Sequence, residues 1–326
     1  MKVGIIGVGF VGTACAKALL LRGSCRSIVL IDTPERAAHT QGVCNDLSHG
    51  AVLCPPTQLE IGSYADLADA DAVVITAGIN EKAGGATNPK DPWGRLRMLP
   101  QNTQIYRAIV PRIIESGCQA PIIVVTDPPD PLADVALDVV RRLGALNPVL
   151  SSGTYLDSVR FRWQLAKRFG CSPGSVDAMV LGEHGKSQVY AWSLARVGGR
   201  PVADLVAELH TPFHAFRDEV QNAVRFANIQ IINGTGASQH GIGIVTARIV
   251  EAILRDEQLV EPIGFYQDDY GLTLSFPARI GARGVSVLPR PLLHEEEMNA
   301  LHAGAALIKK AVQIAAGDGN YDANVP

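Results

Sequence analysis

The stretch KVGIIGVGFVG, residues 2–12, decides the fold of this chain. Its apolar first half is typical of a buried strand, its glycines have the spacing G-x-G-x-x-G, and a helical pattern over Phe10–Arg22 follows. In such a strand–turn–helix unit Gly7 makes the tight turn, Gly9 lets a pyrophosphate approach the backbone, and Gly12 lets the helix pack closely on the sheet. The helix N-terminus supplies amides for the phosphates. We therefore predict a dinucleotide site formed by Gly7, Gly9, Phe10, Val11 and Gly12.

Asp32 lies at the end of the next apolar strand pattern, Ser27–Asp32. A carboxylate at this position can accept hydrogen bonds from the hydroxyl groups of a ribose, and it would repel a ribose 2′-phosphate. The alternative is that Asp32 only caps a turn. Arg36 lies four residues further on and is a nearby cation that could receive a 2′-phosphate. We predict that the cofactor is NAD rather than NADP.

Strand patterns alternate with helical patterns in the first half of the chain. The strand patterns are apolar on every residue, which is typical of a parallel sheet covered by helices on both faces. The predicted strands are Lys2–Gly7, Ser27–Asp32, Ala72–Gly78 and Pro121–Asp127, and the predicted helices are Phe10–Arg22, Gln101–Ser116 and Pro131–Leu143.

Longer helical patterns and short strand-like pieces make up the second half. The predicted helices are Ser158–Phe169, Pro212–Gly234, Gly243–Arg255 and Leu293–Ala316, with strands at Asp177–Leu181 and Leu272–Phe276. Gly, Asn, Pro and Ser cluster near residues 147–152 and suggest a boundary there. We therefore predict an α/β fold, with a doubly wound parallel sheet of the Rossmann type in residues 1–148 and a mixed α+β substrate domain in residues 149–326.

The composition excludes several classes of protein. With 47% hydrophobic and 19% charged residues, the chain has too much apolar material for a disordered protein. The net charge of −3 gives no electrostatic footprint for nucleic acid or for an acidic membrane. No apolar run approaches the length of a membrane span, and the N-terminus lacks the pattern of a signal peptide. We expect a cytoplasmic protein with no nucleic-acid or membrane partner.

The six cysteines are scattered and form no C-x-x-C pair. A secreted domain built on disulfides would be shorter and denser in cysteine, and a structural zinc site would need closely spaced ligands. We therefore expect reduced thiols and no metal.

A histidine between glycines is the first candidate for chemistry. His184 lies in Leu-Gly-Glu-His-Gly, residues 181–185, at the end of a strand-like segment. Upstream, Asp157 and Arg160 have the spacing that places two side chains on one face of a helix. One of them could orient a histidine while the other clamps a carboxylate. The bland alternatives are a structural histidine and a surface ion pair.

Together these segments resemble the L-lactate/malate dehydrogenase superfamily, over almost the whole chain, and most closely its L-lactate and L-2-hydroxyisocaproate dehydrogenases. The resemblance rests on the Leu-Asp-x-x-Arg and Gly-Glu-His-Gly segments. It implies that His184 is the acid/base, that Asp157 is its carboxylate partner, and that Arg160 binds the substrate carboxylate. It also implies an NAD-dependent enzyme that interconverts a 2-hydroxy acid and its 2-oxo acid, as a homodimer or homotetramer.

The same resemblance implies further site residues. Arg95, seven residues before Asn102, matches the family's lid arginine, which polarises the substrate carbonyl. The residues that match cofactor-lining positions are Ala77, Gly78, Asn102, Val125, Asp127 and Ser152.

Asp127 is a departure from the family pattern, which has Asn at this position as a donor to the substrate oxygen. An ionised carboxylate cannot donate that hydrogen bond and would repel the substrate. Three alternatives follow: Asp127 is protonated, it is turned away from the site, or it matches an unusual substrate. If Asp127 disables the site, the chain binds NAD without turning over any hydroxy acid. The four candidate residues His184, Asp157, Arg160 and Arg95 argue against such a loss of activity.

The lid, residues 79–98, is longer than is usual in the family and is rich in Ala, Gly, Asn and Pro. Trp93 either contacts the substrate or packs on the base of the lid. A malate enzyme of this family needs a second cation in the lid, near Glu81, to pair with the distal carboxylate of its substrate. Glu81 is unsuited to a dicarboxylate. Lys82 would suit one if the alignment with the family shifts by one residue. Ser238 belongs to a run of small residues that the resemblance places on the opposite wall of the substrate pocket. We predict lactate or a larger monocarboxylic 2-hydroxy acid as substrate, with malate as the alternative.

Overall fold

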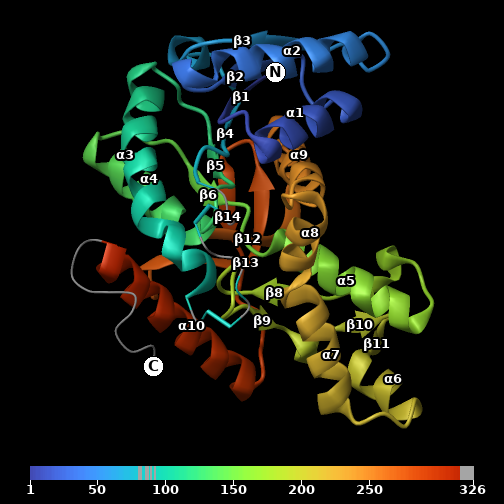
Figure 1. Ribbon diagram of the computed structural model, residues 1–326. Helices are drawn as coiled ribbons and strands as arrows, with labels where there is room; N and C mark the ends of the chain where they lie inside the picture. The colour runs from blue at the N-terminus through green and yellow to red at the C-terminus, as the bar shows by residue number, and fades with distance from the viewer. Residues whose placement is uncertain (80–82, 85–87, 89, 92, 316–326) are drawn as a thin grey trace.

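The computed structural model of the protein describes residues 1–79, 83–84, 88, 90–91 and 93–315 (Figure 1). A nine-stranded sheet runs through the molecule in the order β14-β13-β12-β6-β5-β4-β1-β2-β3. The six parallel strands are β1 (Lys2–Ile6), β2 (Ser27–Ile31), β3 (Gln58–Ile61), β4 (Ala72–Ile75), β5 (Ile122–Val124) and β6 (Val149–Ser151). The antiparallel strands are β12 (Leu259–Gln267), β13 (Leu272–Gly281) and β14 (Gly284–Val287). The order 3-2-1-4-5-6 is that of a doubly wound sheet, so the predicted fold class is confirmed.

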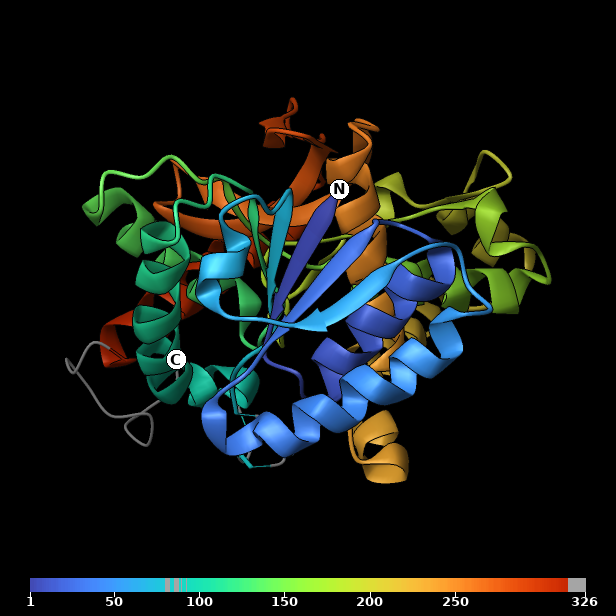
Figure 2. The same ribbon diagram turned by 90° about the horizontal axis from the view of Figure 1, so that it is seen from above.

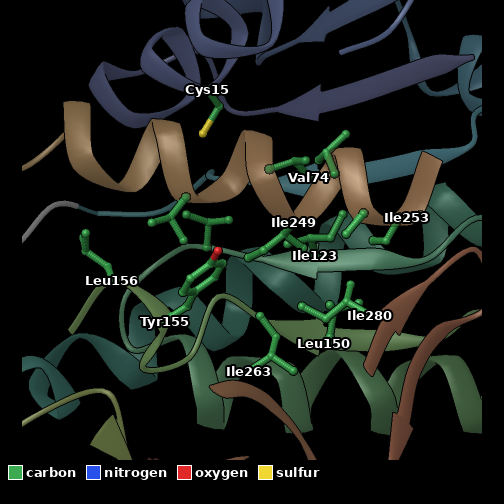
Figure 3. Packing of buried hydrophobic residues seen from close by; sticks show 14 of the residues in the cluster. Cys15, Val74, Ile123, Leu150, Tyr155, Leu156, Ile249, Ile253, Ile263 and Ile280 are labelled. Atoms are coloured by element: carbon green, nitrogen blue, oxygen red, sulfur yellow. The ribbon is translucent and has the colours of Figure 1, made fainter. Parts of the chain in front are cut away.

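Helices cover both faces of the parallel strands. Figure 2 shows α1 (Phe10–Arg22), α2 (Ala37–Ala51) and α9 (His240–Leu254) on one face, and α3 (Leu99–Glu115) and α4 (Pro129–Arg142) on the other. Side chains alternate between the faces because successive residues of a strand point in opposite directions. On β4, Val74 packs in the core under α1 and α9, whereas Val73 and Ile75 pack in the core under α3 and α4. Figure 3 shows Ile249 and Ile253 of α9 close to Val74 and Ile123.

The rest of the second half forms a smaller layer beside the sheet. It contains a three-stranded sheet, β7 (Val176–Asp177), β10 (Arg196–Val197) and β11 (Arg200–Pro201), and a hairpin, β8 (Val180–Leu181) and β9 (Val189–Tyr190). Its helices are α5 (Tyr155–Phe169), α6 (Val202–Glu208), α7 (Phe213–Arg225), α8 (Ala227–Thr235) and α10 (Glu295–Gln313). Phe161 and Trp192 meet edge to face at 4.7 Å in the core of this layer.

Several predicted elements differ from the structure. The single helix predicted over Pro212–Gly234 is two helices, because Phe226 has φ −102° and ψ 8° and leaves the α-helical conformation. The strand predicted over Asp177–Leu181 is split between β7 and β8, which belong to different sheets. Helix α2 and strand β3 were not predicted. β3 is an edge strand whose residues are mostly exposed, so it has no continuous apolar run.

β6 follows directly after the predicted domain boundary at residue 148. It pairs with β5 on one side and, through Ser151 and Gly264, with β12 on the other. Strands from both predicted domains therefore share one sheet. Within the described part of the chain, none of the helices combines the length and the apolar character that a membrane span requires.

Candidate active site

One long cleft opens at the carboxyl ends of the parallel strands. Its volume is about 950 Å³, and it lies where the strand order reverses between β1 and β4. Ligands of doubly wound sheets bind at this switch point. Asp32 and Tyr64 lie toward one end of the cleft, and Arg160 and His184 line the other.

The turn between β1 and α1 has the shape that a pyrophosphate requires. Gly7 has φ +96°, and a Cβ on it would lie 2.4 Å from the amide nitrogen of Ala77. A Cβ on Gly12 would lie 1.9 Å from the carbonyl oxygen of Gly7, whereas a Cβ on Gly9 would meet nothing within 4 Å. Gly9 therefore leaves the backbone open to a ligand, while Gly12 serves the packing of α1 and does not line the cleft. Together with Gly9, the residues Gly7, Phe10 and Val11 line the cleft.

Asp32 is held in place at the end of β2. One carboxylate oxygen accepts a hydrogen bond from the amide of Val8 at 2.9 Å, and the other accepts one from the amide of Thr33 at 2.8 Å. Arg36 donates its Nε to the same carboxylate at 3.0 Å. The cation that could have received a 2′-phosphate is thus paired with Asp32, which suits a ribose with free hydroxyl groups.

The other predicted cofactor residues divide into two groups. Those that line the cleft are Ala77, Gly78, Val125, Asp127 and Ser152. Asn102 does not line it, because its buried side chain connects two loops. Its Oδ1 accepts the amide of Ile79 at 2.9 Å, and its Nδ2 donates to the carbonyl of Asp127 at 2.7 Å. Asn102 therefore lies behind the wall of the cleft, and its contact with the cofactor stays a prediction.

His184 and Asp157 form a buried pair at the catalytic end of the cleft. Nδ1 of His184 is hydrogen-bonded to Oδ2 of Asp157, and Nη1 of Arg160 donates to Oδ1 of Asp157 at 3.1 Å. Burial alone would raise the pKa of Asp157, but His184, Arg160 and Arg95 together lower it to about 2. Burial, the largest single effect, and Arg95 would lower the pKa of His184, but the charge and hydrogen bond of Asp157 and the charge of Asp127 together raise it above its usual value. The pair can therefore hold a proton on the imidazole.

Two arginines complete this end of the cleft. Arg160, on α5, has its Nη2 3.5 Å from the hydroxyl of Ser238, which also lines the cleft. Arg95 lies in a short 3-10 helix (Gly94–Met98), is 12% exposed, and forms an ion pair with Asp127 at 2.9 Å. Each guanidinium faces the same space as Nε2 of His184.

Asp127 faces this space as well. Its Oδ2 is paired with Nε of Arg95, and its Oδ1 lies 3.6 Å from Nε2 of His184. The alternative in which Asp127 is turned away from the site is therefore wrong. Its carboxylate lies between the group that would move the proton and the group that would polarise the substrate.

Asp130 is a buried residue that contacts the candidate site and that the sequence interpretation missed. It is fully buried at the start of α4, where Oδ2 accepts the backbone N–H of His184 at 2.8 Å and Oδ1 accepts the hydroxyl of Ser151 at 2.6 Å. Burial raises the pKa of Asp130 to about 7. Its only signal in the sequence is an acidic residue among three prolines in an otherwise apolar helix start.

The lid residues are only partly described. Trp93 is 2% exposed and does not line the cleft; its ring packs in the core under α3, with Nζ of Lys310 5.9 Å from the ring centroid. The large apolar indole is therefore buried in that core in this structure, and its contact with the substrate stays a prediction. Glu81 and Lys82 lie outside the described residues. Within the described ranges, no group of three or more His, Cys, Asp or Glu side chains could hold a metal ion.

Comparisons with known proteins agree with this geometry. Residues 1–148 match the family profile described as lactate/malate dehydrogenase, NAD binding domain, and residues 154–316 match that described as lactate/malate dehydrogenase, alpha/beta C-terminal domain. The chain is 39% identical to an L-lactate dehydrogenase of Deinococcus radiodurans over 310 residues, covering 95% of this chain and 97% of that protein. It is 38% identical to an L-lactate dehydrogenase of Thermus aquaticus over 320 residues, covering 95% and 98%.

Solved structures give the same result. A minor L-lactate dehydrogenase from Enterococcus mundtii superposes with a TM-score of 0.86 at 31% identity, covering 96% of this chain and 98% of that one. A lactate dehydrogenase from a deep-sea metagenome library of the Medee basin superposes with a TM-score of 0.85 at 31% identity, covering 97% and 98%. The predicted family and the predicted cofactor, NAD, are confirmed. The chain belongs to the lactate/malate dehydrogenase family of NAD-dependent 2-hydroxyacid oxidoreductases.

Proposed function

We propose that the protein interconverts an L-2-hydroxy monocarboxylic acid, either lactate or a larger analogue, and its 2-oxo acid, with His184 as the acid/base. The observation that carries the proposal is the convergence of His184, Arg160 and Arg95 on one end of the cleft. A base, a carboxylate clamp and a cation for the reacting oxygen are the groups that this chemistry needs.

In the oxidation, neutral His184 accepts the proton of the substrate hydroxyl at Nε2. NAD, when bound, supplies the acceptor for the hydride that leaves C2. Asp157 holds Nδ1 of His184, which fixes the ring orientation, and its negative charge stabilises the imidazolium that forms. Arg95 stabilises negative charge on the substrate oxygen. In the reduction of a 2-oxo acid the same groups act in reverse, with protonated His184 as the donor.

Arg160 binds the substrate carboxylate in this mechanism. Its Nη1 is anchored on Asp157, so the guanidinium is oriented before the substrate arrives. Arginine suits this task because its planar fork can pair with both oxygens of a carboxylate. Ser238, next to its Nη2, limits the space beside the clamp.

A monocarboxylic substrate fits the described charges. At the catalytic end of the cleft, the described arginines are Arg95 and Arg160; Arg95 is paired with Asp127, and Arg160 serves the first carboxylate. A dicarboxylate would need a further cation. The wall near Ser238 is built of Ala237 and Ile242, which suit an apolar side chain.

We propose, further, that the protein acts in the cytoplasm as a homodimer or homotetramer and divides at residue 148 into cofactor and substrate domains. The six free thiols support a reducing compartment. Val159 and Trp163, one turn apart on α5, are 38% and 51% exposed and offer an apolar face for a second copy. Light scattering after size exclusion tests the oligomeric state.

The function is tested by NADH oxidation with pyruvate, oxaloacetate, 2-oxoisocaproate and phenylpyruvate. We expect turnover with one or more of the three monocarboxylates and a much lower kcat/KM for oxaloacetate, and we expect His184→Gln to abolish turnover while NADH still binds. Oxaloacetate as the best substrate would establish malate as the physiological partner. NADH binding without turnover of any 2-oxo acid would establish a binding protein instead.

A further inference from the structure

Asp127 lies where the reacting oxygen of the substrate must come. Its two carboxylate oxygens approach Nε of Arg95 at 2.9 Å and Nε2 of His184 at 3.6 Å. In the proposed function, these are the two groups that must contact the oxygen on C2. The substrate oxygen and the Asp127 carboxylate are therefore brought side by side, both facing the same donors.

The two forms of the substrate differ in what they can offer such a neighbour. A hydroxyl group has one hydrogen to donate, whereas a carbonyl oxygen only accepts. An ionised carboxylate also only accepts. It can accept the hydrogen of the hydroxy acid when protonated His184 donates to the oxygen of that hydroxyl group, whereas it stands acceptor to acceptor against the 2-oxo acid. Two acceptors that face each other with no hydrogen between them repel, which costs binding free energy.

Charged groups from several elements surround the carboxylate of Asp127. Arg95 pairs with it from the 3-10 helix, and His184 faces it from the loop after β8. From α5, Asp157 and Arg160 are bonded to each other. Burial and Arg95 lower the pKa of His184, whereas Asp157 and, to a smaller extent, the negative charge of Asp127 raise it. A raised pKa makes the imidazole a stronger base for the hydroxyl proton.

We infer that Asp127 makes the site select the hydroxy acid over the 2-oxo acid. This inference rests on the proposed function. The overall reaction equilibrium is unchanged by any residue of the enzyme. The selection therefore appears in the relative affinities for the two ligands and in the KM values of the two directions.

The test measures two dissociation constants on the complex of the protein with NADH, by quenching of NADH fluorescence. One ligand is oxamate, whose amide carbonyl imitates the oxygen of a 2-oxo acid; the other is the L-2-hydroxy acid that corresponds to the best substrate of the assay panel, which does not react with NADH. In Asp127→Asn, oxamate should bind at least about tenfold more tightly, because one donor replaces one acceptor. The hydroxy acid should bind equally well or more weakly.

Two further variants control this result. Asp127→Ala has neither donor nor acceptor, so the hydroxy acid should bind more weakly while oxamate gains less than in Asp127→Asn. Ser238→Ala alters the surroundings of Arg160, which both ligands share, so it should change both constants by the same factor. NADH affinity reports that each variant is folded.

An unchanged ratio of the two constants in Asp127→Asn, with NADH binding intact, would overturn the inference, because it would mean that Asp127 already donates a proton or does not touch the ligand. Failure of the wild type to turn over any acid of the panel would instead overturn the proposed function. The two failures are therefore separate.

Discussion

Asp130 and His184 are joined through the backbone: the carboxylate of Asp130 accepts the peptide N–H of His184 at 2.8 Å, although the two residues are 54 positions apart in the chain. The imidazole is therefore fixed twice. Asp157 holds its ring, and Asp130 holds the peptide from which the ring extends. The second contact also connects the histidine loop to β6 through Ser151.

Replacing Asp130 should lower kcat as well as stability. In Asp130→Asn the amide can keep only one of the two accepted hydrogen bonds, so we expect a stability loss of about 1 to 3 kcal/mol and a lower kcat from a displaced His184. The matched control is Asp134→Asn, one turn along α4, where Oδ1 accepts hydrogen bonds from the amide and the hydroxyl of Thr273, at 2.8 and 2.6 Å. The control should retain kcat. Equal effects on kcat in both variants would show that Asp130 acts through stability alone.

The raised pKa of Asp134 should make the free energy of unfolding depend on pH. Burial raises its pKa to about 6, so the folded protein holds a proton that the unfolded chain releases near pH 4. Its contribution to stability is therefore full below pH 4 and is lost as the pH rises through 6. Relative to wild type, Asp134→Asn should become more stable by about 1 to 3 kcal/mol between pH 4.5 and 7.5. Urea unfolding of the two proteins at both pH values measures this, and parallel changes would contradict it.

Substitution of Arg160 by lysine should weaken binding of the substrate while binding of the cofactor is retained. Lysine keeps the charge but cannot form two parallel bonds to a carboxylate, so KM for the 2-oxo acid should rise by about one to two orders of magnitude. NADH affinity should stay within about twofold. Arg162→Lys is the control, since that guanidinium pairs with Glu261 outside the cleft. Equal weakening of NADH and substrate by Arg160→Lys would assign it a structural role.

Asp32 should make the protein prefer NADH to NADPH by at least about tenfold in kcat/KM, because a 2′-phosphate would face a carboxylate. Asp32→Ser removes that charge and releases Arg36 from its ion pair. The variant should therefore gain activity with NADPH. If the wild type used both cofactors equally, Arg36 would already reach the 2′-phosphate, and the pairing seen here would not govern selectivity.

Local patterns predicted the parallel half of the fold well. The helix Phe10–Arg22 was predicted to the residue, because glycine spacing and apolar periodicity act over neighbouring positions. α2 was missed, since in it only Thr40 and Cys44 are buried and the apolar stripe is weak. The break between α7 and α8 has no Gly or Pro to announce it. Contacts with the rest of the molecule decide such features.

The candidate site shows the same division. Motif spacing singled out His184, Asp157 and Arg160, and the structure brings them into contact, while their catalytic roles stay predictions for the variants above. Asn102 and Trp93 were assigned to ligands through the resemblance to the family, and the structure buries them in loop and core contacts. Asp130 could not be predicted, because its importance depends on a peptide group far along the chain.

Strand β6 joins the two halves of the chain into one continuous sheet. Because β6 is bonded to β5 on one edge and to β12 on the other, residues 1–148 in isolation would end at an open sheet edge, with the groups of β5 that bond to β6 exposed. Exposed edges of this kind promote aggregation. The two halves should therefore unfold together in one cooperative transition. A half taken from another protein could replace one of them only if it also supplied the neighbouring strand for the other.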